Sequence, residues 1–200
     1  MKTLFLTAAI LFVSACVTAQ DVKLPTPQTT GGKPLFDAFR SRQSDRNISD
    51  ANLDLQTISE VLWSAYGFNR NDKRVIPTAN NKQEIEVYAV LKDGIYLYDA
   101  KNNALILKAS GDHRKIAGAQ PFVHIAPLNI IYVADFSKGT TLLQSSVACG
   151  AASQNVYLAS ASKGLGCVVR TTINSEELHK VLKLTADQQV LLGQTVGKTK

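Results

Sequence analysis

Three residues with phosphate-binding side chains alternate along a short stretch near the N-terminus. Arg42, Ser44 and Arg46 stand at positions i, i+2 and i+4. Guanidinium groups are planar sets of donors that match phosphate oxygens, and a serine hydroxyl can add a hydrogen bond to the same anion. An extended segment would point all three side chains the same way. The stretch therefore fits one phosphate monoester, although a solvated basic loop is the more common use of such a cluster.

A second stretch could contact the edge of a heterocycle. The segment 77–84 reads Pro-Thr-Ala-Asn-Asn-Lys-Gln-Glu and is rich in amide side chains. Asn and Gln each offer a donor and an acceptor, which suits a ring such as the pyrimidine of a flavin. Asn also favours turns, so turn formation is the alternative interpretation.

Composition and charge limit the class of protein. The chain has 200 residues, a formal net charge of +6 and 45% hydrophobic residues, which is enough for one domain with a substantial core. No run of five or six basic residues occurs, so nucleic-acid binding is not expected. Cys149 and Cys167 could form a disulfide in an exported protein, but two cysteines make no framework and we expect them to stay unbridged.

The N-terminus predicts export. Lys2 precedes an apolar run from Leu4 to Val13, which is shorter than the roughly 20 residues that span a bilayer. We expect a signal peptide over residues 1–19 and a periplasmic protein. The alternative is a lipoprotein anchored to the membrane through Cys16. A linker or extended arm over 20–33, without packed structure, and one domain over 34–200 would follow.

The hydrophobic pattern predicts an α+β fold with a mixed sheet. We expect helices over 34–40, 55–66, 121–126, 145–162 and 174–182, and strands over 85–91, 95–98, 104–109, 128–134, 167–171 and 189–196. In the first helix, Leu35, Phe36 and Phe39 would form the buried side. Residues 68–81 have no clear periodicity and are expected to form an irregular loop.

Six pieces of sequence occur in an order that resembles the nitroreductase family of flavoenzymes, especially the small branch with the peptide thiazoline and oxazoline oxidases. In chain order they are Arg-Gln-Ser-Asp-Arg (42–46), Leu-Trp-Ser-Ala-Tyr-Gly (62–67), segment 77–84, Gly-Ile-Tyr-Leu-Tyr-Asp (94–99), Ser-Gln-Asn-Val-Tyr-Leu (153–158) with Gly-Leu-Gly (164–166), and Gln-Thr-Val-Gly (194–197). Each piece is weak alone, but together they favour the phosphate interpretation of residues 42–46.

The resemblance implies non-covalent FMN at the interface of an intertwined homodimer. The phosphate and ribityl end would be held by the first basic stretch, namely Arg42, Gln43, Ser44 and Arg46. The partner subunit would contact the flavin through Pro77, Thr78, Asn81 and Gln83. The backbone of Val169, Arg170 and Thr171 would run along the flavin edge, and Lys198 would supply a late basic contact.

The resemblance also implies the chemistry. The flavin itself carries hydride, so no separate catalytic side chain is expected. We expect an exported FMN-dependent oxidoreductase that moves electrons from NAD(P)H or another donor to a small-molecule acceptor. The alternatives are a flavin-dependent oxidase of a peptide or small molecule, and a flavin-binding module without turnover.

Overall fold

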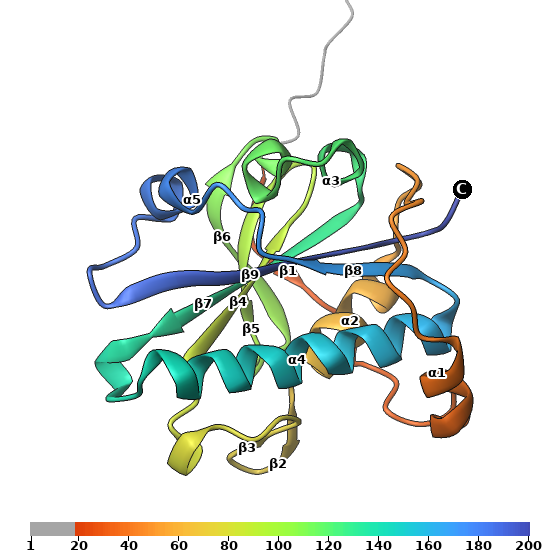
Figure 1. Ribbon diagram of the computed structural model, residues 1–200, viewed down its shortest axis with the longest axis horizontal. Helices are drawn as coiled ribbons and strands as arrows, with labels where there is room; N and C mark the ends of the chain where they lie inside the picture. The colour runs from red at the N-terminus through yellow and green to blue at the C-terminus, as the bar shows by residue number, and fades with distance from the viewer. Residues whose placement is uncertain (1–18) are drawn as a thin grey trace, which may run out of the picture.

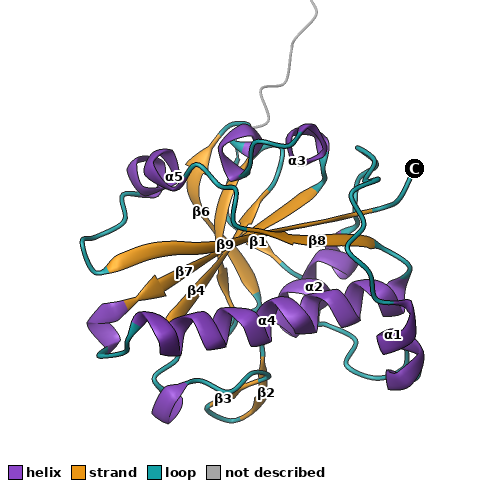
Figure 2. Ribbon diagram, viewed as in Figure 1, coloured by secondary structure: helices purple, strands orange, loops and turns teal. Residues whose placement is uncertain are grey.

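The computed structural model describes residues 19–200 and shows one seven-stranded sheet with helices on both faces (Figures 1 and 2). The expected signal peptide, apart from Ala19, and the possible anchor at Cys16 lie outside the described residues. The α-helices are α1 (Leu35–Ser41), α2 (Leu55–Tyr66), α3 (Pro121–Ile125), α4 (Leu142–Lys163) and α5 (Ser175–Leu182). Short 3-10 helices are η1 (Ala79–Asn81), η2 (Arg114–Ala117) and η3 (Phe136–Lys138).

The strands of the large sheet lie in the order β1-β6-β5-β4-β7-β9-β8. Their bounds are β1 (Val22–Lys23), β4 (Ile85–Val90), β5 (Gly94–Asp99), β6 (Ala104–Ser110), β7 (Leu128–Asp135), β8 (Gly166–Arg170) and β9 (Gln188–Gly197). All pairings in this sheet are antiparallel within residues 19–200, so the prediction of a mixed sheet was wrong. The reason is that β9 lies between β7 and β8 and pairs antiparallel with both. The strands β7 and β8 run in the same direction but do not pair with each other.

Two hydrophobic layers lie on opposite faces of the sheet. Along β4, Val87 and Ala89 face the core beneath α2 and α4, whereas Tyr88 and Val90 face the core that includes residues of η2, α3 and α5. This alternation follows from the two-residue repeat of a strand. Nearly every residue of β4 and β7 is buried, because both faces of the central strands are covered.

Helix α2 forms as the sequence predicts. The Asp54 side chain caps its N-terminus by accepting a hydrogen bond from the Thr57 backbone N–H at 2.7 Å, and Gly67 follows its last residue. The sequence predicts an apolar stripe of Leu55, Ile58, Val61, Leu62 and Ala65, of which the last four are buried on the sheet and Leu55 is 43% exposed. The predicted helix is therefore confirmed, and its buried side is confirmed except at Leu55.

Helix α1 forms as predicted, but the prediction of its buried side was wrong. Ala38 is buried, whereas Leu35 is 57% exposed, Phe36 83% and Phe39 49%. A helical repeat shows which residues share a face but does not show what covers that face. The apolar side of α1 is uncovered within the described chain.

Helix α4 is the long helix in front of the sheet in Figure 1. It begins three residues earlier than predicted, because Thr141 and Gln144 form a capping box. In this box the side chain of each residue accepts a hydrogen bond from the backbone N–H of the other. It ends at Gly164, which adopts a left-handed conformation with φ of 69°. Small residues let it approach the sheet closely, and Ala148 and Ala152 are fully buried there.

The N-terminal arm is extended, as expected, but it is packed rather than free. β1 pairs with β6, and Leu24 is only 3% exposed. Further along, the Ser59 hydroxyl donates to the Pro25 carbonyl at 2.6 Å, and the Lys33 N–H donates to Ser162 Oγ at 2.8 Å. The arm therefore belongs to the folded domain.

A small antiparallel hairpin replaces the irregular loop expected over 68–81. It consists of β2 (Phe68–Arg70) and β3 (Lys73–Arg74). These strands are short and polar, so they lack the alternating pattern by which strands are recognised. Among residues 19–200, no helix combines the length and apolar character needed to cross a membrane.

Candidate functional site

The clamp segment, residues 42–46, is an extended chain laid against the beginning of β8. Helix α1 ends just before it, and Arg42 has extended backbone angles of φ −63° and ψ 125°. The Asp45 N–H donates to the Cys167 carbonyl at 2.9 Å, which fixes the segment to the edge of the sheet. In Figure 1 this chain is the orange segment between α1 and α2, near the C-terminus.

The C-terminal tail lies beside the clamp segment. The Ser49 N–H donates to the Lys198 carbonyl at 2.8 Å, and the Lys200 N–H donates to the Asn47 carbonyl at 2.9 Å. Between them Ile48 is fully buried. The predicted late basic residue, Lys198, is therefore held a few residues from the clamp segment, and its side chain is exposed.

Tyr157 of α4 joins the clamp segment to β8. Its hydroxyl lies 2.7 Å from Ser44 Oγ and accepts a hydrogen bond from the Val169 N–H at 2.9 Å. The Arg42 guanidinium carbon lies 5.2 Å from the centre of the Tyr157 ring, within the range of a cation–π contact. The sequence analysis assigned Tyr157 no role, because nothing in a sequence shows that residue 157 meets residue 44.

The arginines of the clamp segment keep their hydrogen-bond donors free. Arg42 is half-buried and Arg46 is exposed, and within residues 19–200 neither side chain donates a hydrogen bond or forms an ion pair. Arg114, by contrast, is paired with Asp112 at 2.6 Å. Gln43 lies in the same segment but lines a cavity of about 410 Å³ together with Asp45 and Asn47.

The Arg170 side chain forms buried hydrogen bonds within the fold. This role was not predicted from the sequence, where only the backbone of Arg170 was expected to belong to the site. Its Nη1 donates to the Ala117 carbonyl at 2.7 Å, and its Nη2 donates to Thr195 Oγ1 at 2.8 Å and to Asn129 Oδ1 at 3.3 Å. Burial lowers the pKa of Arg170 to about 10. Only the backbone of Arg170 is therefore available to a ligand at the edge of β8, where Thr171 is exposed.

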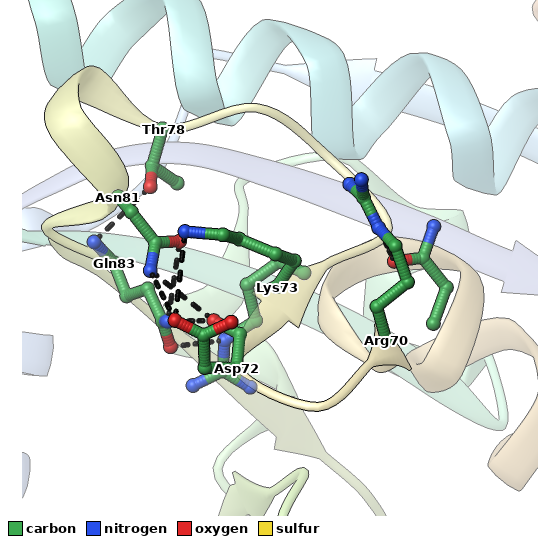
Figure 3. Close-up of polar contacts among 8 residues, drawn as sticks. Arg70, Asp72, Lys73, Thr78, Asn81 and Gln83 are labelled. Carbon is green, nitrogen blue, oxygen red and sulfur yellow. Dashed lines mark hydrogen bonds and ion pairs between the residues drawn. The ribbon is translucent and has the colours of Figure 1, made fainter.

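The amide-rich loop holds the β2–β3 hairpin together (Figure 3). Gln83 Oε1 accepts from Arg74 Nε at 2.9 Å, and Gln83 Nε2 donates to the Asp72 carbonyl at 2.8 Å. Asn81 Nδ2 also donates to the Asp72 carbonyl, at 3.2 Å, and Thr78 Oγ1 accepts from the Gln83 N–H at 3.2 Å. These bonds support the interpretation of the segment as a turn. The contact between this loop and a flavin stays a prediction.

Arg74 anchors this hairpin to α2. Its guanidinium carbon lies 4.1 Å from the centre of the Tyr66 ring and 3.9 Å from that of Phe68. Asn81 and Gln83 adopt left-handed backbone conformations, with φ of 57° and 52°. Such conformations are uncommon for residues other than glycine, so the loop has a defined shape. Pro77, which precedes it, is exposed.

The two predicted halves of the site lie at different ends of α4 in one chain. Lys82, beside η1, donates to the Gly139 carbonyl just before α4 begins, whereas the clamp segment contacts Tyr157 near its end. Figure 1 shows η1 and the hairpin below the N-terminal half of α4 and the clamp segment at its other end. A helix of 22 residues is about 33 Å long. One chain alone therefore does not bring the amide-rich loop to the clamp segment.

Comparison with known proteins decides the family. A family model described as the nitroreductase family matches residues 39–198. The chain belongs to the nitroreductase family. A nitroreductase-like protein of Methanocaldococcus jannaschii is 28% identical over 167 residues, which cover 75% of this chain and 84% of the relative.

Solved structures of nitroreductase-like proteins share the fold. One from Ralstonia eutropha has a TM-score of 0.85 and 34% identity, and the match covers 100% of this chain and 96% of that one. Another, from Desulfovibrio desulfuricans in complex with FMN, has a TM-score of 0.63 and 20% identity, covering 84% and 88% of the two chains. Members of the nitroreductase family are mostly FMN-dependent oxidoreductases, so the class of protein expected from the sequence is confirmed.

The donors of this nitroreductase chain fit the phosphate of FMN. Arg42, Ser44 and Arg46 combine two positive charges with a hydroxyl on one short segment, and neither guanidinium group has a hydrogen-bond or ion-pair partner within the described residues. Acceptor-only phosphate oxygens are the natural complement of such a set. The buried thiols take no part, because burial raises the pKa of Cys149 to about 12 and that of Cys167 to about 11. They are also not joined to each other.

Proposed function

We propose that this protein binds FMN with its phosphate between Arg42 and Arg46 and uses it to transfer hydride from NAD(P)H, or another donor, to a small-molecule acceptor. The observation that carries this proposal is the pair of arginines that flank Ser44 at the edge of β8 and have no hydrogen-bond or ion-pair partner among residues 19–200. Bound FMN would supply the redox chemistry. The chain itself would hold the phosphate through the clamp segment and orient the ring along the backbone of residues 169–171.

Completing the flavin site requires a second copy of the chain. The amide-rich loop lies near the N-terminal half of α4 and the clamp segment near its C-terminal end. If two α4 helices pack antiparallel about a two-fold axis, the loop of one subunit comes beside the clamp segment of the other. The expected homodimer is thus the arrangement in which both predicted halves can contact one flavin.

The outer face of α4 has the character of such an interface. Leu143 is 75% exposed and Val147 is 61% exposed, and the stripe continues through Gly150 near the middle of the helix. A methyl group added at Gly150 would meet no atom of its own chain within 4 Å. The exposed aromatic residues of α1 lie beside the C-terminal end of α4, where an antiparallel partner would place its own Leu143.

We expect a dimer in solution that the substitution Gly150→Leu dissociates. The added side chain has open space in the monomer, and leucine favours a helix more than glycine does, so the monomer should stay folded. The same bulk would block close approach of two helices and lower flavin affinity at least tenfold. Light scattering measures the mass, and FMN titration measures the affinity. Lys180→Leu on α5, which packs on the opposite face of the sheet, is the control and should remain dimeric. A monomeric wild-type protein that still binds FMN would contradict this arrangement.

The visible absorbance of the purified protein tests the proposed function. We expect FMN absorbance, identified by mass, that bleaches under anaerobic conditions when NADH or NADPH is added. Bound FMN that reacts with neither nucleotide, combined with oxygen uptake on a peptide or small molecule, would favour an oxidase. FMN without turnover in either assay would favour a binding module, and failure of the apoprotein to bind added FMN would refute the proposal.

We further propose that the protein works outside the cytoplasm. The support is the basic and apolar N-terminal sequence, which predicts a signal peptide. The mass of the mature protein from its native host distinguishes cleavage after Ala19 from lipidation at Cys16, and an intact N-terminus would contradict both.

A further inference from the structure

Two hydrogen bonds of the Tyr157 hydroxyl link the backbone of β8 to the clamp segment. The Val169 N–H can only donate, and it donates to the Tyr157 hydroxyl oxygen at 2.9 Å. The Tyr157 hydroxyl carries one hydrogen of its own, and its other partner is Ser44 Oγ at 2.7 Å. Either hydroxyl could donate across this contact, but donation by Tyr157 is the arrangement that gives its hydrogen an acceptor, because Tyr157 is only 6% exposed and has no other acceptor within the described residues.

The bond from Tyr157 determines which acceptors remain for the hydroxyl hydrogen of Ser44. Once Ser44 Oγ accepts from Tyr157, its own O–H has to point toward another acceptor. Within the described residues Ser44 has no other hydrogen-bond partner, and its side chain is exposed on the clamp segment. Ser44 is therefore oriented as a donor toward whatever lies between Arg42 and Arg46.

We propose that Tyr157 is a positioning residue that makes Ser44 a committed hydrogen-bond donor, so that the clamp segment selects an acceptor-only phosphate over a neutral hydroxyl. This inference rests on the proposed FMN site and adds a determinant of its selectivity. A phosphate monoester near neutral pH carries close to two negative charges and offers only acceptors around most of its surface. The terminal hydroxyl of riboflavin, which stands where FMN has its phosphate, carries a donor hydrogen of its own and brings no charge.

The Tyr157 ring serves the same segment. Arg42 lies over it, and only 6% of Tyr157 is exposed, so the ring is a fixed platform within the main core. Tyr157→Phe keeps this platform and removes one oxygen atom. The variant therefore separates the hydroxyl relay from the packing and from the cation–π contact.

The test compares affinities for FMN and riboflavin at fixed salt. For Tyr157→Phe we expect FMN affinity to fall about tenfold and riboflavin affinity to change less than twofold, so that the selectivity ratio falls about tenfold. Tyr88→Phe is the matched control, because its hydroxyl donates to Glu86 Oε2 at 2.6 Å and its ring is buried on the opposite face of the sheet. This control should keep the wild-type ratio even if it lowers thermal stability.

A double-mutant cycle tests whether Tyr157 acts through Ser44. In a Ser44→Ala background, adding Tyr157→Phe should leave the ratio unchanged within twofold, because the relay has already lost its end point. Additive losses would overturn the inference. An unchanged ratio in Tyr157→Phe alone would also overturn it, while leaving the FMN site standing. Failure of the wild-type protein to prefer FMN would instead count against the proposed function.

A measurement on the wild-type protein covers the case in which Tyr157→Phe does not fold. Hydrogen bonds in a chain strengthen one another, so a phosphate at Ser44 should tighten the bond from the Val169 N–H. Amide hydrogen exchange at Val169 should therefore slow more with saturating FMN than with saturating riboflavin. Equal protection by the two ligands would contradict the relay.

Discussion

The wild-type protein should bind FMN at least a hundredfold more tightly than riboflavin. The two ligands share the ring, so the difference reports the phosphate alone. Arg42 and Arg46 have no hydrogen-bond or ion-pair partners within residues 19–200, and each charge-assisted hydrogen bond contributes about 1.5–3 kcal/mol. Two such bonds at the lower limit give about 3 kcal/mol, or roughly a hundredfold.

Variants separate the phosphate contacts from the ring contacts. Arg42→Ala and Arg46→Ala should each weaken FMN by about 1.5–3 kcal/mol and shrink the FMN-to-riboflavin ratio, as measured by titration of the apoprotein. Gln83→Ala should leave the ratio unchanged, because Gln83 belongs to the hairpin loop expected at the ring. A wild-type ratio near one would end the case for a phosphate site, and unchanged FMN affinity in both arginine variants would move that site elsewhere.

Arg170→Met should destabilise the fold by about 2–4 kcal/mol in urea unfolding. The substitution keeps an unbranched side chain but removes donors from the Ala117 carbonyl, Asn129 and Thr195, which are all buried. The Ala117 carbonyl loses its side-chain donor, whereas Asn129 Oδ1 still accepts from Thr195 Oγ1 at 2.6 Å. Loss of hydrogen bonds from a charged group costs about 1.5–3 kcal/mol each, offset in part by removal of a buried charge.

The same substitution at an exposed arginine provides the control for stability. Arg40 is largely exposed, and within residues 19–200 it pairs only with Asp37 in the same helix, so Arg40→Met should change stability by less than about 0.5 kcal/mol. A loss below about 1 kcal/mol in Arg170→Met would show that solvent or neighbouring groups satisfy the buried acceptors.

Local sequence signals predicted much of this fold because they report local physics. Asp54 and Gly67 bound α2 as expected, and the turn at Lys92 and Asp93 joins β4 to β5. The capping box formed by Thr141 and Gln144 is also a local signal in the sequence, and it marks the start of α4.

Features that depend on distant contacts were not predictable in this way. The exposed face of Phe36 and the contact between Ser44 and Tyr157 depend on which segments meet in space. For the same reason the sequence could nominate Arg42 and Arg46 as ligands of a phosphate but could not show that Tyr157 supports them. The side chain of Arg170 was likewise missed, because its acceptors come from three separate segments.

The position of β9 has a consequence for biosynthesis. This strand is the last in the chain, yet it lies between β7 and β8 and pairs with both of them. While a ribosome still holds residues 188–197 in its exit tunnel, β7 and β8 each lack a neighbour and the core cannot close. The nascent chain must therefore remain incompletely folded until residues 188–197 have left the tunnel, and a protein that lacks β9 would expose two unpaired edges to other chains.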